Sequence, residues 1–304
     1  MLFAAMSVIW GIPYLLIKVA VKHVDPPVIV FARTSIAGVV LLVLAARTDA
    51  LRAALRHWRP VLLFAAVEMG VPWLFLTDAE KRLPSGLTGL LVACVPIFGA
   101  LAAYTLGDHA ALRPMRLLGI AIGLAGVALV VGRGLGNGAH GIPWWSVAEV
   151  MLVCVGYSIG PFIVARRLGD VPSIGVVSVS LAAVAVVVAP LAWLARPTHV
   201  PPASALAALV TLAAVCTGLA FVVFFSLIAQ IGPTRATLIT FANPAVAVVL
   251  GALVLDESIT LATLGGFVLV STGCWLATRA HAVVVANVEG VASLNDVRNA
   301  SSAS

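Results

Sequence analysis

Residues 65–70 of the chain read Ala-Ala-Val-Glu-Met-Gly, and residues 213–218 read Ala-Ala-Val-Cys-Thr-Gly. The two stretches lie 148 positions apart. The same offset aligns further pairs: Leu90 with Leu238, Pro96 with Pro244 and Asp108 with Asp256. At an offset of 147, two glycine pairs follow: Gly119 with Gly266 and Gly126 with Gly273. Apolar stretches can match by composition alone, but matched Pro, Asp and Gly residues indicate that the chain consists of two related halves.

The composition identifies the kind of protein to which these halves belong. Of 304 residues, 62% are hydrophobic and 10% are charged, whereas about 25% of the residues of a soluble domain are charged. So few charges cannot cover a soluble globule, and a disordered chain would be poor in apolar residues. The net charge of +6 comes from basic residues in short gaps between apolar runs, so we expect no nucleic-acid partner. The chain is therefore predicted to be a polytopic membrane protein.

Ten apolar segments are long enough to cross a membrane, because about 20 helical residues span about 30 Å of hydrocarbon. We expect these helices at residues 2–21, 27–46, 60–78, 86–106, 114–132, 143–165, 174–195, 204–229, 235–255 and 260–280. The predicted domains are a first repeat at 1–132, a linker at 133–142, a second repeat at 143–280 and a disordered tail at 281–304.

Each half contains five of these segments. Since five is odd, the second half must enter the membrane from the side opposite to the first, which is the inverted-topology repeat of many secondary transporters. Basic residues in the loops indicate the orientation. With the N-terminus inside, eleven of them lie on the inner side and six on the outer side. We therefore expect a multi-pass protein of the cell membrane with both termini in the cytoplasm.

Three stretches of the chain carry a resemblance to a known family. They are Ile9-Trp10-Gly11-Ile12-Pro13 to Lys18 with the later Phe31-Ala32-Arg33, then Val95-Pro96 to Gly107-Asp108, and Asn243-Pro244 to Asp256-Glu257. These stretches are similar to the motifs of the EamA-type unit in the drug/metabolite transporter (DMT) superfamily. The resemblance implies an all-α integral membrane fold of ten transmembrane helices, arranged as two inverted five-helix EamA repeats. It also implies transport of small metabolites, often as export.

Glu68 lies in the middle of an expected span, and its counterpart in the second half is Cys216. The repeated scaffold therefore does not require an acid at this position. An ionisable group at membrane depth costs about 2.5–3.5 kcal/mol on insertion scales and mostly faces a cavity or a partner. We expect Glu68 to line a central cavity, where it binds a cationic group or takes up a coupling proton. The alternative is a protonated side chain that donates a hydrogen bond to a neighbouring helix.

Several polar aromatic side chains and one amide also lie inside expected spans, instead of in the interfacial belts where Trp and Tyr collect. They are Trp10, Tyr14, Trp73, Tyr157 and Asn243. Rings of this kind suit a cavity for amphipathic solutes, and an amide in lipid is costly without a partner. Together with Glu68 they form the predicted substrate-binding set, and helix packing is the alternative for each ring taken singly.

Other candidates lie nearer the membrane surfaces or at bends. Lys18 and Arg33 are near the outer ends of their spans, where long basic side chains commonly reach the headgroups, but the family resemblance implies a functional role. Glu149 could be an acid of an outer vestibule or could reach the interface. Pro96 and Pro244 are matched prolines inside spans, and each removes a backbone hydrogen bond. They predict paired bends that help the halves move, with a static kink as the alternative.

The remaining patterns concern chemistry and partners. The four cysteines have no metal-ligand spacing, so we interpret them as apolar packing residues. We expect no enzyme, no catalytic residue, no cofactor and no metal. The predicted function is that of a secondary active transporter, an exporter of a small metabolite or drug-like solute by alternating access that could be coupled to protons. An integral-membrane enzyme acting on a lipid-linked substrate is the alternative. Expected partners are the solute and membrane lipids, and glycine-rich faces could also serve a homodimer.

Overall fold

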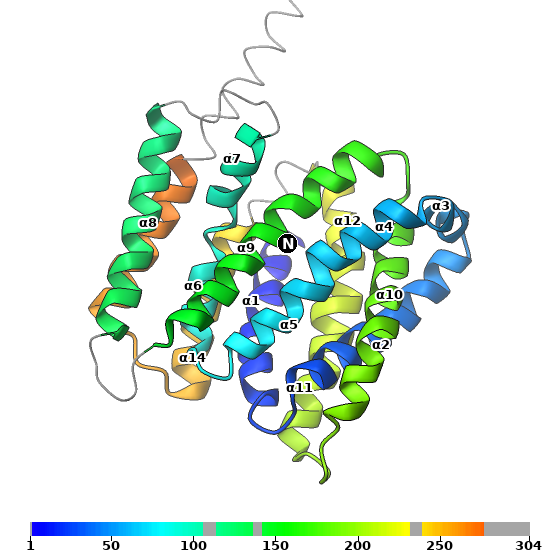
Figure 1. The fold of residues 1–304 in the computed structure, drawn as a ribbon, viewed down its shortest axis with the longest axis horizontal. Coiled ribbons are helices and arrows are strands. Elements are labelled where there is room, and N and C mark those ends of the chain that lie inside the picture. The colour runs from blue at the N-terminus through cyan, green and yellow to red at the C-terminus, as the bar shows by residue number, and fades with distance from the viewer. Residues whose placement is uncertain (1, 106–113, 136–141, 232–238, 277–304) are drawn as a thin grey trace, which may run out of the picture.

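A computed structural model of the chain describes residues 2–105, 114–135, 142–231 and 239–276. Within these ranges every regular element is a helix (Figure 1). A helix satisfies its own backbone N–H and C=O groups, which lipid cannot do, so long apolar stretches adopt this form in a membrane. The predicted all-helical class is confirmed. The tail at 281–304 and most of the linker at 133–142 lie outside the described residues.

The helices follow one another with short connections. Those of the first half are α1 (Leu2–Ala20), α2 (Pro26–Ala46), α3 (Ala50–Arg56), α4 (Trp58–Phe64), η1 (Ala65–Gly70), α5 (Val71–Ala79), α6 (Ser85–Val92), α7 (Val95–Thr105) and α8 (Pro114–Leu135). Those of the second half are α9 (Trp144–Arg167), α10 (Ser173–Leu194), α11 (Ala203–Ala213), η4 (Ala214–Leu219), α12 (Ala220–Ile231), α14 (Ile239–Leu255) and a last helix at Leu261–Leu276.

The positions of the apolar helices agree with the pattern in the sequence. Seven described helical segments are long and apolar enough to cross a membrane, and three further apolar helices are shorter. The shorter ones are Ala4–Ala20, Ala242–Leu255 and Leu261–Leu276. Each of these ten segments overlaps one of the ten expected spans. The short helix α3 in the Arg-rich loop was not expected. The fourth span, for which a bend at Pro96 was expected, is divided by a full break into α6 and α7.

The repeated stretch of sequence forms a π-helical turn in both halves. The turn η1 lies between α4 and α5, and η4 lies between α11 and α12, so each interrupts one long helix near its middle. In η4 the hydroxyl of Thr217 donates to the carbonyl oxygen of Leu212 at 2.9 Å, which holds this side chain against its own helix. Single π-helical turns inside α-helices are frequent at functional sites. The two halves therefore share a backbone feature as well as a sequence pattern.

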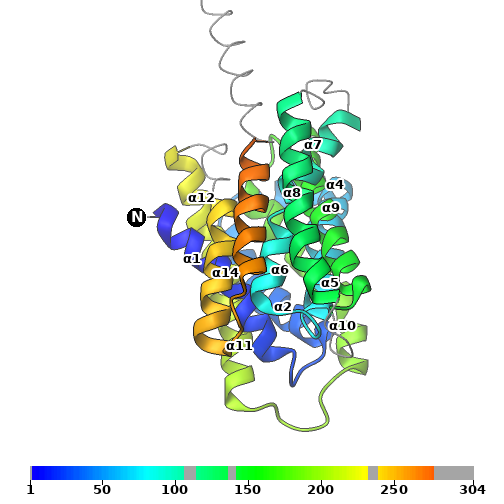
Figure 2. The same cartoon turned by 90° about the vertical axis from the view of Figure 1, so that its left-hand side faces the viewer.

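Helices of the two halves pack against one another throughout the bundle. The helix α2 packs along α10, α1 packs against α14 and α11, and α5 packs against α9 (Figures 1 and 2). Gly38 of α2 lies against Leu181 of α10, and Ala50, which follows α2, lies against Gly175 at the start of α10. The helices α2 and α10 therefore run antiparallel.

The helix α8 and the helix Leu261–Leu276 lie side by side (Figures 1 and 2), and glycines form their contact. A Cβ on Gly273 would lie 2.5 Å from the carbonyl oxygen of Gly119. A Cβ on Gly126 would lie 3.0 Å from the carbonyl oxygen of Gly266. Because Gly119 precedes Gly126 while its contact Gly273 follows Gly266, the two helices run antiparallel. Their close approach uses the matched glycines of the two halves, as small residues do between membrane helices.

Gly273→Ala is expected to lower the thermal stability of the purified protein, because the methyl group would meet backbone atoms of α8. Overpacking of this kind costs about 1–3 kcal/mol. Gly132→Ala is the matched control, since Gly132 lies on α8 and a Cβ there has no neighbour within 4 Å. Alanine at this position gains up to about 1 kcal/mol of helix propensity. Equal melting temperatures for the two variants, measured by tryptophan fluorescence in detergent, would contradict the close glycine contact.

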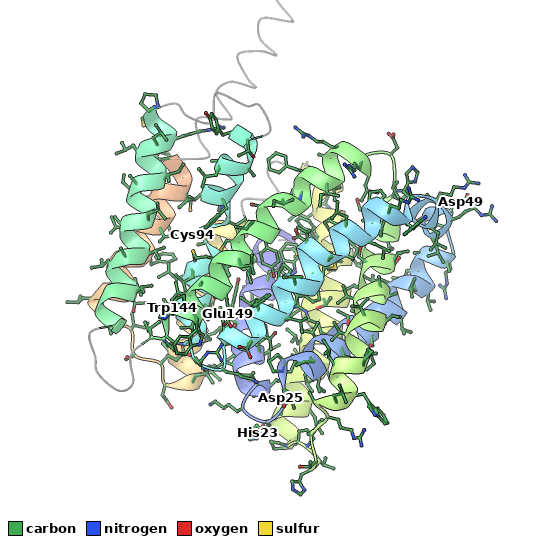
Figure 3. The ribbon with its side chains drawn as sticks, viewed as in Figure 1. His23, Asp25, Asp49, Cys94, Trp144 and Glu149 are labelled. Carbon is green, nitrogen blue, oxygen red and sulfur yellow. The ribbon has the colours of Figure 1, made fainter. Side chains whose placement is uncertain are left out.

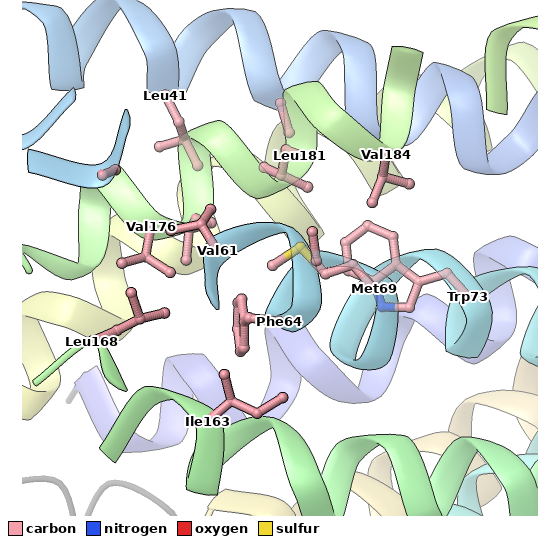
Figure 4. Close-up of a cluster of buried hydrophobic side chains, with 14 of the residues drawn as sticks. Leu41, Val61, Phe64, Met69, Trp73, Ile163, Leu168, Val176, Leu181 and Val184 are labelled. Carbon is pink, nitrogen blue, oxygen red and sulfur yellow. The ribbon is translucent and has the colours of Figure 1, made fainter. Parts of the chain in front are cut away.

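One hydrophobic cluster fills the space between α2, α10 and the segment from η1 to α5 (Figure 4). Met69, Leu181 and Val184 are buried in it, and Trp73 lies beside Val184 with 6% of its surface exposed. Buried side chains in a protein core interdigitate at high density. The cluster therefore holds the Trp73 ring in a defined position next to α2.

Candidate functional site

A buried arginine joins the two halves of the bundle. Arg33 lies on α2 and is 8% exposed. Its Nε donates to Oγ1 of Thr217 at 2.7 Å, and its Cζ lies 3.6 Å from the centre of the Trp73 ring. No described carboxylate forms an ion pair with it. A guanidinium over an aromatic face gains about 2 kcal/mol or more when desolvated, but the ring does not neutralise its charge.

The two π-helical turns determine where the partners of Arg33 lie. Trp73 comes three residues after η1, and Thr217 lies within η4. The wider turn changes the rotation of the helix, so the residues that follow it face another direction than in an uninterrupted α-helix. A hydroxyl from one repeated stretch and a ring beside the other thus meet at one guanidinium group.

Two tyrosines of the predicted set lie close to this arginine. Tyr14 of α1 is buried, and Tyr157 of α9 packs against the same cluster of side chains. Tyr157 also packs against the cluster that contains Trp73. Both tyrosines are near enough to Arg33 to interact with its charge. Three of the six residues predicted to bind substrate, Tyr14, Trp73 and Tyr157, therefore surround a residue that the sequence suggested only as a peripheral candidate.

Two other members of the predicted set lie elsewhere along α1 and α14. The Trp10 ring centroid lies 4.6 Å from that of Phe224 and 6.1 Å from that of Phe221, both on α12. Asn243 on α14 is half-buried, and its backbone carbonyl oxygen would lie 3.2 Å from a Cβ on Gly11. The Trp10 ring thus packs against aromatic rings of the second half.

Glu68 lies on η1 and faces α9. Its carboxyl group lies so close to Gly160 that any side chain at Gly160 would collide with its Oε2 atom. That oxygen is buried and has no hydrogen-bond partner, which costs about 1–3 kcal/mol. Glu68 also interacts electrostatically with Tyr157. Packing and hydrogen bonding therefore give no reason for an acid here, whereas its position next to Tyr157 connects it to the arginine site.

Glu80 is a candidate that the sequence analysis did not identify. It directly follows α5, its side chain is 0% exposed, and both of its carboxyl oxygens are buried without a partner. The Nζ atom of Lys18 donates 2.7 Å hydrogen bonds to the backbone carbonyl oxygens of Glu80 and Leu83. Lys18 thus binds the end of α5 in this structure. The sequence contains one signal for it. The residue that matches Glu80 at the 148-residue offset is Ile228, so the repeated scaffold does not require an acid at this position.

Charged side chains also hold the connection between α5 and α6, which we call the 80–86 turn (residues 80–86). Arg82 donates to Oε2 of Glu149 at 2.9 Å and to Oγ of Ser146 at 2.6 Å, both on α9. It also pairs with Asp78 near the end of α5. Glu149, a peripheral candidate in the sequence, is therefore the partner of a basic residue in the other half.

Two further contacts restrain the 80–86 turn. Lys81 pairs with Asp25, in the α1–α2 connection, at 2.9 Å. Glu257, which follows α14, accepts a hydrogen bond from the backbone N–H of Ser85 at 2.7 Å. Asp25 and Glu149 lie toward the same end of the bundle (Figure 3). The described ion pairs thus gather at one end of the protein.

The two hinge candidates differ in their surroundings. Pro96 lies just after the break between α6 and α7, whereas Pro244 lies within the unbroken α14. At the break, the thiol of Cys274 donates to the carbonyl oxygen of Ala93 at 2.9 Å, and that of Cys154 donates to a carbonyl oxygen of α6 at 3.4 Å. These thiols satisfy carbonyl groups at a helix end inside the membrane. Within the described ranges, no three His, Cys, Asp or Glu residues are grouped as metal ligands.

Comparisons with known proteins agree with this geometry. The sequence model of the EamA-like transporter family matches residues 1–132 and 144–279. The chain is 28% identical over 253 residues to the "uncharacterized inner membrane transporter YedA" of Escherichia coli strain K12, which covers 81% of this chain and 79% of that protein. It is 25% identical over 291 residues to the "uncharacterized transporter YvbV" of Bacillus subtilis strain 168, with 93% and 92% covered. A solved structure described as "Crystal structure of protein" shares the fold, with a TM-score of 0.65 at 22% identity over 91% of this chain and 95% of that one.

Proposed function

Because the chain belongs to the EamA-like transporter family and is a multi-pass protein of the cell membrane, we propose that it exports a small solute by alternating access. In this proposal it is a secondary active transporter made of two inverted five-helix repeats. The relatives that it matches are themselves described as transporters. Glu68 is the proposed carrier of a coupling proton.

The contact between Arg33 and Thr217 is the observation that carries this proposal. It joins α2 of the first half to η4 of the second, so movement of one half against the other changes the space around a buried cation. Ionisable groups at membrane depth mark solute and ion pathways. Since Arg33 has no ion-pair partner among the described residues, the solute that suits it carries a carboxylate or another anionic group.

The aromatic residues of the predicted set supply the remainder of the proposed site. Trp73 already lies over the guanidinium of Arg33, and Tyr14 and Tyr157 are close to its charge. Rings of this kind bind the apolar part of a solute, and a few polar groups fix its orientation. Trp10 and Asn243 extend the proposed set along α1 and α14.

Antiparallel helices support the inverted arrangement of the two halves, and irregular helical turns support their movement. The matched helices α8 and Leu261–Leu276 run antiparallel, and α2 and α10 do as well, as halves of opposite orientation require. The π-helical turns, and the break before Pro96, are sites where a helix can bend. We propose Pro96 and its counterpart Pro244 as the hinge positions.

The test of the proposed function is binding of small acids to the purified protein in detergent. Each acid of the panel is paired with its uncharged amide, which has nearly the same size and shape but lacks the negative charge. An acid that binds and is present at a free concentration of 100 times its Kd is expected to stabilise the protein by about 2.7 kcal/mol, which a thermal melt detects. Its amide is expected to have a much smaller effect. Equal stabilisation by acid and amide would contradict an anion site at Arg33.

The acid that stabilises most is then used in proteoliposomes. A pH gradient is expected to drive its transport by the wild-type protein, and Glu68→Gln is expected to slow this transport about tenfold, equivalent to about 1.4 kcal/mol in the barrier. Exchange of solute for solute without a gradient is expected to remain, because it needs no net proton movement. An unchanged rate and pH dependence in Glu68→Gln would rule out its role as proton carrier.

A further inference from the structure

The backbone of the 80–86 turn is held at both ends by charged side chains. The Nζ atom of Lys18 donates to the carbonyl oxygens of Glu80 and Leu83, each at 2.7 Å. The carboxylate of Glu257 accepts from the N–H groups of Ser85 and Gly86 at 2.7 and 3.0 Å. A cation at a helix C-terminus and an anion at a helix N-terminus both stabilise the helix dipole. The end of α5 is thus held by α1, and the start of α6 by the segment after α14.

The carboxyl group of Glu80 is enclosed beside this arrangement. It is 0% exposed, and neither oxygen has a hydrogen-bond partner. Burial raises the pKa of Glu80 well above its usual range, and the nearby charge of Lys18 opposes this rise. An enclosed carboxylate without hydrogen bonds is far more costly than the neutral acid. The structure with the turn held in place is therefore that of the protonated acid.

Charged and titratable groups face Glu80 from several segments. Lys18 and Tyr14 come from α1, Arg33 from α2, and Glu257 from the segment after α14. Among the charged groups, Lys18 has the largest electrostatic influence on Glu80. On α9, which packs against α5, Glu149 is already bound by Arg82. The ammonium group of Lys18 is thus the cation best placed to respond when Glu80 becomes charged.

We propose that Glu80 is a proton-binding site that controls the 80–86 turn. With the proton bound, Lys18 remains on the two backbone carbonyl oxygens and the turn is held. When the O–H bond of the carboxyl group breaks and the proton passes to water, the carboxylate forms an ion pair with Nζ of Lys18. The carbonyl oxygen of Leu83 then loses its donor, and the turn keeps its contacts through Lys81, Arg82 and Glu257 but loses the one from α1.

The geometry makes this exchange a short movement. The Nζ atom already lies at the backbone of Glu80 itself, so rotation about side-chain bonds suffices to bring it to the carboxylate. A charge-assisted hydrogen bond to a carboxylate is roughly twice as strong as one between neutral groups. Because the proton stabilises the held state, opening of the turn is expected to increase as the pH rises through the pKa of Glu80. A role of this site in coupling a proton to solute movement rests on the proposed function, but the effect of the proton on the turn does not.

Leu83→Cys reports on the turn, since Leu83 is 0% exposed while the turn is held. The purified protein in detergent is treated with a maleimide over a series of pH values. Val200→Cys, at a position that is 87% exposed, gives the rate for an accessible thiol at each pH, and the wild type with its four buried thiols gives the blank. The rate ratio of Leu83→Cys to Val200→Cys is expected to rise at least about tenfold across the titration.

Two substitutions in the Leu83→Cys background separate the parts of this proposal. Glu80→Gln, which resembles the protonated acid, is expected to keep the ratio low at every pH. Lys18→Gln replaces the charged donor with a shorter, neutral amide, which weakens the hold on the turn, and is expected to give a high ratio at every pH. An unchanged pH dependence in Glu80→Gln, or a low ratio in Lys18→Gln, would overturn the proposal. If the wild type shows this pH dependence of labelling but transports none of the acids in proteoliposomes, the result counts against the proposed function alone.

Infrared spectroscopy tests the same site without any substitution in the turn. A protonated carboxyl group without hydrogen bonds has a characteristic carbonyl band, which is expected to disappear over the pH range in which labelling increases. Among the described residues, Glu68 is the other enclosed acid with an unpaired oxygen. Glu68→Gln removes it, so a band that persists in this variant is assigned to Glu80. Absence of the band from Glu68→Gln at low pH would overturn the assignment of the proton to Glu80.

Discussion

Replacing Arg33 with glutamine is expected to weaken binding of the proposed anionic solute at least about 100-fold, because hydrogen bonds to charged groups contribute about 1.5–3 kcal/mol each. The guanidinium is the buried cation between the two halves, and its contacts with Trp73 and Thr217 leave its charge without a counter-ion among the described residues. The affinity is measured by titration calorimetry with the acid that gives the largest thermal stabilisation of the wild type.

The fold is expected to survive this substitution. Removing one member of a buried ion pair destabilises a protein because it leaves the other charge alone, and Arg33 leaves no such charge behind. The hydroxyl of Thr217 keeps its bond to Leu212. The lost contact with Trp73 removes about 2 kcal/mol, but the variant also no longer buries a charge without an ion-pair partner. A melting temperature close to that of the wild type is therefore the expected control result, and it separates loss of the site from loss of the fold.

Two further variants distinguish the charge of Arg33 from its shape. Arg33→Lys keeps the charge but loses the planar fork that binds a carboxylate with two hydrogen bonds, so its affinity is expected to lie between those of the wild type and Arg33→Gln. Thr217→Val removes the acceptor of the Nε–H group without changing the charge, and its effect is expected to be below about tenfold. Affinity in Arg33→Gln equal to that of the wild type would show that the solute binds elsewhere.

The apolar helices were predictable from the sequence because their length and composition alone distinguish them from the polar turns. The π-helical turns were not, since residues 65–70 are as apolar as the α-helical turns on either side. Only the match with residues 213–218 distinguished this stretch from its neighbours, and the match does not predict a π-helical turn. The break between α6 and α7 was predictable in part, because Pro96 favours a bend, but the thiol donors Cys154 and Cys274 come from distant segments.

The site residues were also predictable only in part from the sequence. Glu68 stands out because it is an acid within a long apolar run. Arg33 lies seven residues into its helix, so position alone suggested a side chain reaching the headgroups, whereas packing of α2 between η4 and α5 buries it. Glu80 precedes Lys81 and Arg82 in a stretch that resembles a solvated turn. Its burial arises from tertiary contacts that residue patterns do not contain.

Arg82→Glu is expected to destabilise the end of the bundle where the described ion pairs gather. The substitution replaces the contact between α5 and α9 with a repulsion, because Asp78 and Glu149 already lie there. Reversing both charges, in Arg82→Glu/Glu149→Arg, restores an attraction between the two helices. The double-mutant cycle is expected to give an interaction energy of about 1–2 kcal/mol in thermal melts, and the single variant is expected to increase labelling of Leu83→Cys.

The more exposed pair between Lys81 and Asp25 is the control for this double-mutant cycle. Its side chains are 33% and 57% exposed, against 29% and 18% for Arg82 and Glu149. Exposed pairs contribute about 0–1 kcal/mol and are screened by salt, so the cycle Lys81→Glu/Asp25→Lys is expected to give the smaller energy and to lose it in high salt. Equal energies would mean that burial between α5 and α9 adds nothing. A larger and salt-resistant energy for Arg82 and Glu149 would mean that the lower exposure of this pair strengthens the contact between the end of α5 and α9, and so between the two halves.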